Sequence, residues 1–286
     1  MRLAYRTLFS LPAPLRDPAT ASVNGTQAAL LGGLDAADTS SNEIQLIDAH
    51  RVVYRGTLPG VQHDAQGATL NGQVYVFGGG DLSELNHILG FDPGRHGVHP
   101  VGVLPTASSD VAVTAVGGTA YVVGGFDGSR YLDTILAWRP GAPAKVVGHL
   151  PVGLRYSAVT AAGGKVIIAG GSTPAGASRA IYSFDPATGQ LRRIGQLPHP
   201  ITHAGAASLG GYVYLVGGRG DAVTAQTRSV WSINPSTGAV RPAGRLPIPL
   251  SDAGVVALGQ SILVVGGFTG QSTVAAVGEL ARASAP

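Results

Sequence analysis

The stretch GQVYVFGGGD, Gly72 to Asp81, places a glycine pair directly after a short apolar run. Near-copies return as GTAYVVGGFD, GYVYLVGGRG and QSILVVGGFT. The glycine pairs recur every 46 to 49 residues, at Gly32-Gly33, Gly78-Gly79, Gly124-Gly125, Gly170-Gly171, Gly217-Gly218 and Gly266-Gly267. A Leu-Pro pair keeps the same period, from Leu11-Pro12 to Leu246-Pro247. Six repeats therefore fill the chain.

Each repeat breaks into four short apolar runs, as in DVAVTAV, TAYVVGG, DTILAWRP and AKVVGHLP of the third repeat. This pattern predicts four strands per repeat. Pairs such as Asn71-Gly72 and Gly117-Gly118 join the first two runs and favour tight hairpins with positive φ, and Asn24-Gly25 stands at the same place in the first repeat. Turns that begin Asp92-Pro93, Asp185-Pro186 and Asn234-Pro235 join the last two.

Six antiparallel sheets without helices between them can bury both faces if they stand radially, which predicts an all-β, six-bladed β-propeller. The chain begins with a fourth-strand sequence and ends after a third, so residues 2–10 are expected to complete the last blade and close the ring. We expect one domain, residues 1–286, with blades at 17–57, 64–103, 110–149, 156–196, 203–245, and 252–280 plus 2–10.

The repeats resemble the kelch family over the whole chain. The resemblance rests on the glycine pair, a tyrosine three residues before it (Tyr75, Tyr121, Tyr214), a later Phe-Asp-Pro, and the recurrent Leu-Pro. Kelch repeats usually carry a tryptophan on the fourth strand, where Val53, Lys145, Arg192 and Arg241 stand here. Blade packing is therefore expected to depend on Val, Ile, Leu and Ala.

Composition excludes several functions. The chain has no cysteine, which removes disulfides, thiolate metal sites and cysteine nucleophiles. Its net charge of +3 comes from arginines scattered singly along the sequence, which does not predict nucleic-acid binding. No signal peptide is visible, so a cytoplasmic protein and a trimmed secreted or cell-envelope domain both stay open. We expect a soluble monomer without membrane insertion and without a cofactor.

In a propeller of this topology, the loops after each Leu-Pro and each glycine pair share one face, where ligand contacts are expected. Four blades place a carboxylate at equivalent positions near the channel mouth: Asp17, Asp64, Asp110 and Asp252. Converging carboxylates could hold calcium or magnesium. Alternatively, each bonds amides of its own loop, which is the role we favour.

The other side of this face offers a basic and aromatic set: Arg155, Tyr156, Arg179, His203, Arg219, Arg130 and Tyr131. A guanidinium group forms two parallel hydrogen bonds with a carboxylate, so these residues are candidates for binding an anionic group. The alternative is a set of solvated rim arginines stacked on their neighbours.

Fold does not determine function, so the functional prediction is an analogy. We expect a non-catalytic binding module for a protein or glycan ligand, with an anionic ligand fitting the arginine side. One alternative is a carbohydrate enzyme of the sialic acid mutarotase type, which the kelch resemblance suggests; another is a scaffold domain of a larger protein. A galactose-oxidase-like copper radical enzyme is excluded, because its cysteine-linked tyrosine cannot form.

Overall fold

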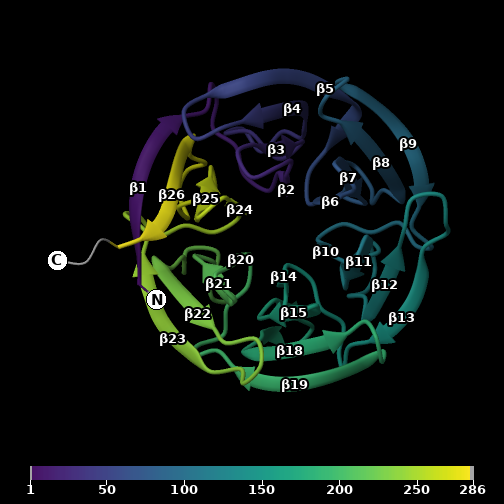
Figure 1. The fold of residues 1–286 in the computed structure, drawn as a ribbon, viewed down its shortest axis with the longest axis vertical. Helices are drawn as coiled ribbons and strands as arrows, with labels where there is room; N and C mark the ends of the chain where they lie inside the picture. Colours follow the sequence, from purple (N-terminus) through teal and green to yellow (C-terminus); the bar gives the residue numbers. More distant parts are fainter. Residues whose placement is uncertain (1, 284–286) are drawn as a thin grey trace.

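The computed structural model describes residues 2–283, and these form a ring of six four-stranded antiparallel sheets around a central axis (Figure 1). The predicted all-β six-bladed propeller is thus confirmed. Within the described range, no helix is long and apolar enough to span a membrane.

Each blade begins with its innermost strand and ends with its outermost. Blades one to three comprise, in order, β2 (Ala19–Ser22), β3 (Ala28–Leu31), β4 (Ser41–Ile47) and β5 (Val52–Gln62); β6 (Gln66–Leu70), β7 (Gln73–Phe77), β8 (His87–Asp92) and β9 (Gly97–Val103); β10 (Ala112–Val116), β11 (Thr119–Val123), β12 (Thr134–Trp138) and β13 (Lys145–His149). Blades four and five comprise β14 (Ala158–Ala162), β15 (Lys165–Ala169), β18 (Ala180–Asp185) and β19 (Gln190–Gln196); β20 (Gly205–Leu209), β21 (Tyr212–Val216), β22 (Ser229–Ile233) and β23 (Val240–Arg245). A small hairpin, β16 (Ser172–Thr173) and β17 (Gly176–Ala177), projects from blade four.

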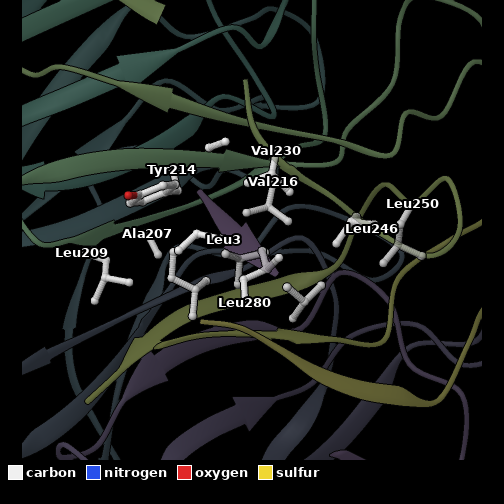
Figure 2. Packing of buried hydrophobic residues seen from close by; sticks show 13 residues of the cluster. Leu3, Ala207, Leu209, Tyr214, Val216, Val230, Leu246, Leu250 and Leu280 are labelled. Atoms are coloured by element: carbon white, nitrogen blue, oxygen red, sulfur yellow. The ribbon is translucent and has the colours of Figure 1, made fainter. Parts of the chain in front are cut away.

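The two ends of the chain together build the sixth blade. It comprises β24 (Gly254–Leu258), β25 (Ser261–Val265) and β26 (Ala276–Arg282), and β1 (Leu3–Ser10) pairs antiparallel with β26 as its outer strand. Leu3 is buried among residues of blades five and six, including Leu280 and Val230 (Figure 2). The ring is therefore closed by the N-terminal strand, as expected.

The turns within the blades follow the sequence signals, with one exception. Both residues of Asn71-Gly72 and of Gly117-Gly118 have positive φ. The Asp92 carboxylate accepts hydrogen bonds from the amides of Gly94 and Arg95. Asn24-Gly25 differs: the Asn24 side chain accepts from the amides of Thr26 and Gln27, so the first hairpin is longer than a two-residue turn.

The glycine pair is where each blade meets the next. The amide of its second glycine donates to a backbone carbonyl in the segment that leads into the following blade, at 2.8 to 2.9 Å. The six bonds are Gly33 to Gln62, Gly79 to Ser108, Gly125 to Leu154, Gly171 to Ile201, Gly218 to Leu250 and Gly267 to Leu15. The last of these crosses from blade six back to blade one.

Both glycines have positive φ and leave no room for a side chain. A Cβ on the first glycine, such as Gly124, would collide with the carbonyl of the next blade. A Cβ on Gly125 would lie 2.7 Å from Val111 of its own blade and 2.8 Å from the Ser109 carbonyl oxygen. The first glycine of each pair is therefore confined by the neighbouring blade, while the second is confined by its own blade.

The blades pack through aliphatic clusters that span each interface, as predicted. Blades two and three add an aromatic group, in which Trp138 is 1% exposed and packs edge-on against Tyr75 and Phe77. This tryptophan lies on the third strand of its blade, not the fourth. The fourth strands are exposed to solvent, so the indole ring is buried on the third strand instead.

The shared blade yields a direct test. A chain beginning at Leu11 lacks β1, which leaves β26 with an unpaired edge and removes the Leu3 side chain from its cluster. We expect a fall in melting temperature of several degrees, measured by differential scanning calorimetry. A melting point within a degree or two of the full chain would show that β1 is dispensable.

Gly79→Val and Gly125→Val should each lower the free energy of unfolding by about 2 kcal/mol or more, through strained φ and overlap with fixed neighbours. Chemical denaturation measures the change. Gly97→Val is the matched control, because nothing lies within 4 Å of a Cβ there and φ is not in the left-handed region. Equal losses at all three positions would contradict the packing account.

Candidate functional site at the channel mouth

The two sets of loops predicted to share a face are joined there by backbone bridges. In each loop that follows a Leu-Pro, one residue forms an antiparallel bridge with the residue that follows a glycine pair. The bridges are Arg16 with Leu34, His63 with Gly80, Ser109 with Phe126, Arg155 with Ser172, Thr202 with Arg219 and Ser251 with Phe268. The next residue in each blade then turns toward the axis.

These next residues form what we call the mouth ring: Asp17, Asp64, Asp110, Tyr156, His203 and Asp252. All six have φ between 50° and 59°, in the left-handed region. In five of them the amide donates to the carbonyl of the ring residue in the preceding blade, at 2.9 to 3.2 Å: Asp17 to Asp252, Asp110 to Asp64, Tyr156 to Asp110, His203 to Tyr156 and Asp252 to His203. The backbone thus fixes where the six side chains begin.

The mouth ring opens into a cavity of about 340 Å³ on the propeller axis. Below the ring, the innermost strands line the cavity with small side chains, among them Ala21, Ala112, Ala158, Ala206 and Ala257. This volume lies within the range of small-molecule sites.

Burial shifts the ionisation of the ring carboxyls. It raises the pKa of Asp17 well above its usual range, and the charges of Asp252 and Asp64 add to the shift. Burial and the charge of Asp64 raise the pKa of Asp110 to about 8, although Arg155 opposes this. Burial also raises the pKa values of Asp64 and Asp252. The four carboxyls therefore do not all ionise at neutral pH.

Arg155 is held between acid and aromatic groups. Its Nε lies 2.6 Å from Oδ2 of Asp110, whose side chain is 1% exposed, and its Nη2 donates to the Tyr156 hydroxyl at 3.1 Å. The guanidinium lies 4.8 Å from the Phe126 ring centre and 5.2 Å from that of Tyr131. Arg155 is thus held by Asp110 and these aromatic rings, and its guanidinium is not free to receive an anion.

Tyr156 and His203 form the non-acidic side of the ring. Their rings stack with centres 3.7 Å apart, and the Tyr156 hydroxyl donates to Asp64 at 3.1 Å. Nε2 of His203 lies 3.2 Å from a guanidinium nitrogen of Arg219. Burial, with the charges of Arg219 and Arg155, lowers the pKa of His203 to about 2, so the imidazole is neutral.

The structure brings together only part of the predicted basic set. Arg155, Tyr156, His203 and Arg219 form one connected chain, with Tyr131 beneath the Arg155 guanidinium. Arg179 instead donates to the Leu197 carbonyl at the end of an outer strand. Arg130 pairs with Asp127 in its own loop and is 77% exposed. Neither contacts the ring.

Sequence reasoning missed Arg16, which mirrors Arg155 across the ring. Its guanidinium lies 4.6 Å from the Phe268 ring centre, and Nη2 lies 2.8 Å from Asp38. A signal was present: Pro-x-x-Leu-Arg occurs only in the two repeats that follow a Gly-Gly-Phe, and each arginine covers that phenylalanine.

The ring aspartates do not take the turn-stabilising role that we favoured. Across residues 2–283, no amide of the same loop donates to any of the four carboxylates; Asp252 accepts from the Ser251 hydroxyl and Asp64 from Tyr156. The same range contains no group of three or more His, Cys, Asp or Glu placed to hold a metal ion. Oδ1 of Asp252 is buried without a hydrogen-bond partner.

Comparisons with known proteins agree with the fold. The family model of the Kelch motif matches residues 107–141 and 200–247. Among solved structures, the one titled "Structure of YjhT" superposes with a TM-score of 0.81 at 16% sequence identity, covering 94% of this chain and 96% of that one. A search of curated proteins finds no significant match. At this identity the likeness shows the fold, which is compatible with a binding or scaffold module in general.

The ring carboxyls predict an unusual pH dependence. A carboxyl whose pKa is raised by folding stabilises the protein fully below about pH 4, and this contribution is lost as the pH rises toward 8. The melting temperature should therefore fall between pH 5 and pH 8, and Asp17→Asn should reduce that fall because it removes one carboxyl from the cluster. An unchanged pH profile in the variant would contradict the assignment.

Proposed function

Since the chain is a kelch-repeat propeller with a polar ring around an axial cavity, we propose that it is a binding module that recognises a glycan at the channel mouth. The observation that carries this proposal is the mouth ring above a cavity of about 340 Å³. Carboxyls that retain their protons both donate and accept hydrogen bonds, as sugar hydroxyls do.

The orphan oxygen of Asp252 supports a ligand that donates hydrogen bonds. A buried acceptor without a partner is costly, and a ligand hydroxyl reaching Oδ1 would relieve that cost. The stacked rings of Tyr156 and His203 add an apolar surface on the opposite side of the ring from Asp17. A polyhydroxylated ligand with apolar C–H faces complements both features.

The ring favours a neutral glycan over an anionic ligand. Arg155 is already paired with Asp110, and four carboxyls share the mouth, so a second anion would gain little there. Arg219 could bind an acidic substituent of the glycan, since it contacts loop carbonyls and His203 but, among residues 2–283, no carboxylate within ion-pair distance.

A carbohydrate enzyme of the mutarotase type is the second candidate, and the raised pKa of Asp110 favours it. A carboxyl with a pKa of about 8 lies near the pH at which acid–base catalysis is efficient. In anomer exchange an acid protonates the ring oxygen while a base removes the proton of the anomeric hydroxyl, so that the ring C–O bond breaks and a carbonyl forms. Rotation of that carbonyl, followed by attack of the freed hydroxyl on its other face and return of the two protons, gives the other anomer. NMR exchange spectroscopy of anomers, with and without the protein, tests this candidate.

A glycan array followed by isothermal titration calorimetry with the best neutral binder tests the proposed function. Asp252→Ala should weaken binding at least tenfold, about 1.4 kcal/mol, because it removes the unpartnered acceptor. Asp252→Asn, which resembles the protonated carboxyl, should retain most of the affinity.

Asp92→Ala, in a turn on the opposite face, is the control and should bind like the wild type. Equal losses in Asp252→Ala and Asp252→Asn would show that the carboxylate charge, and so a cationic ligand, is recognised. Loss of binding in Asp92→Ala alone would show that the ligand uses the other face.

A further inference from the structure

The outer wall of blades four to six carries a strong excess of positive charge. Six exposed arginines lie on β19, on β23, just before β22 and just before β1: Arg192, Arg193, Arg241, Arg245, Arg228 and Arg2. Within residues 2–283, no carboxylate lies within ion-pair distance of any of them. Six cations gathered on one wall exceed the net charge of the whole chain, +3, so the remainder carries a net charge of −3.

Acidic side chains are almost absent from this part of the molecule. Residues 186–283 contain three, and each is occupied: Glu279 pairs with Arg6, Asp221 accepts from the Ala177 amide, and Asp252 lies in the mouth ring. On the opposite half, by contrast, Glu43 pairs with Arg55 on β5. The scarcity of acids is thus a property of this stretch of sequence, and the fold brings its arginines on β19 and β23 together with Arg2 on one wall.

The six arginines lie on one continuous surface, which we call the basic wall. A Cβ on Gly195 of β19 would lie 2.6 Å from the Gly238 carbonyl oxygen, just before β23, and one on Gly244 of β23 would lie 2.7 Å from the Leu3 carbonyl oxygen on β1. The three outer strands thus follow one another around half of the circumference (Figure 1).

We propose that this wall binds a flexible acidic polysaccharide, at a site separate from the channel mouth. The guanidinium group of arginine forms paired hydrogen bonds with sulfate and carboxylate groups. Because the wall is convex, a flat anionic membrane could touch only a narrow strip of it, whereas a linear chain can follow it. None of the three strands has an exposed large apolar or aromatic side chain within the described range, so they lack the stacking surfaces of single-stranded nucleic-acid sites.

The test compares two triple variants with the same loss of charge. Arg193→Gln, Arg241→Gln and Arg245→Gln remove three of the six wall arginines. Arg51→Gln, Arg95→Gln and Lys145→Gln remove three exposed cations from blades one to three. Binding of a size-defined heparin oligosaccharide is titrated by fluorescence between 50 and 200 mM salt, with oligo(dT) and anionic vesicles as competitors. Melting temperatures verify that both variants fold.

We expect the wall variant to lose at least tenfold in affinity, and the slope of log affinity against log salt to fall by about 2, because about 0.7 counterions are released per charge in a single-stranded polyanion. The control variant should bind within twofold of the wild type. An equal loss of affinity in both variants would show that binding depends only on the net charge of the protein, which would overturn the proposal. Tighter binding to oligo(dT) or to vesicles would overturn the assignment to a polysaccharide.

Discussion

One backbone hydrogen bond, made six times, determines how this ring is assembled. The amide of the second glycine in each pair donates to a carbonyl of the segment that leads into the next blade. An amide buried at a blade interface needs such a partner, and only a residue without a side chain brings the two backbones close enough. The repeated Gly-Gly is therefore a requirement of the blade interface and not of the strand that precedes it.

The same junction creates the functional face. Two residues after the carbonyl that is bonded to the preceding glycine pair, the chain adopts positive φ and directs the mouth-ring residue to the axis. Aspartate tolerates that conformation better than most residues, which gives a local reason for four carboxyls among six positions. Their burial, however, raises their pKa values, to which neighbouring carboxylates add at Asp17, and Oδ1 of Asp252 is left buried without a partner. A structural constraint thus produces a polar ring that a hydroxyl-rich ligand can use.

The sequence predicts the fold well because the period, the turn residues and the strand lengths are local signals. The count of blades, the order of strands and the closure by residues 2–10 all follow from them. Identification of the mouth-ring positions also follows, since they hold a fixed place after each Leu-Pro. The first hairpin was misjudged because Asn24 caps a longer loop with its own side chain.

The interactions within the site were less predictable, because they join residues of different blades. Arg155 was expected to face a ligand, but its guanidinium contacts Asp110, and Arg179 donates to a carbonyl at the outer edge. The basic wall was not predicted for the same reason: Arg192-Arg193, Arg241 and Arg2 belong to distant parts of the sequence and come onto one wall only when the ring closes.

Hydrogen exchange at the six second-glycine amides tests the central claim most directly. Because these amides hold adjacent blades together, they should exchange only through global unfolding, with the same opening free energy as the core strands. The turn amides of Gly72 and Gly118, with open space around them, should exchange quickly. Exchange of the amides of Gly79 and Gly125 as fast as these turn amides would contradict the account.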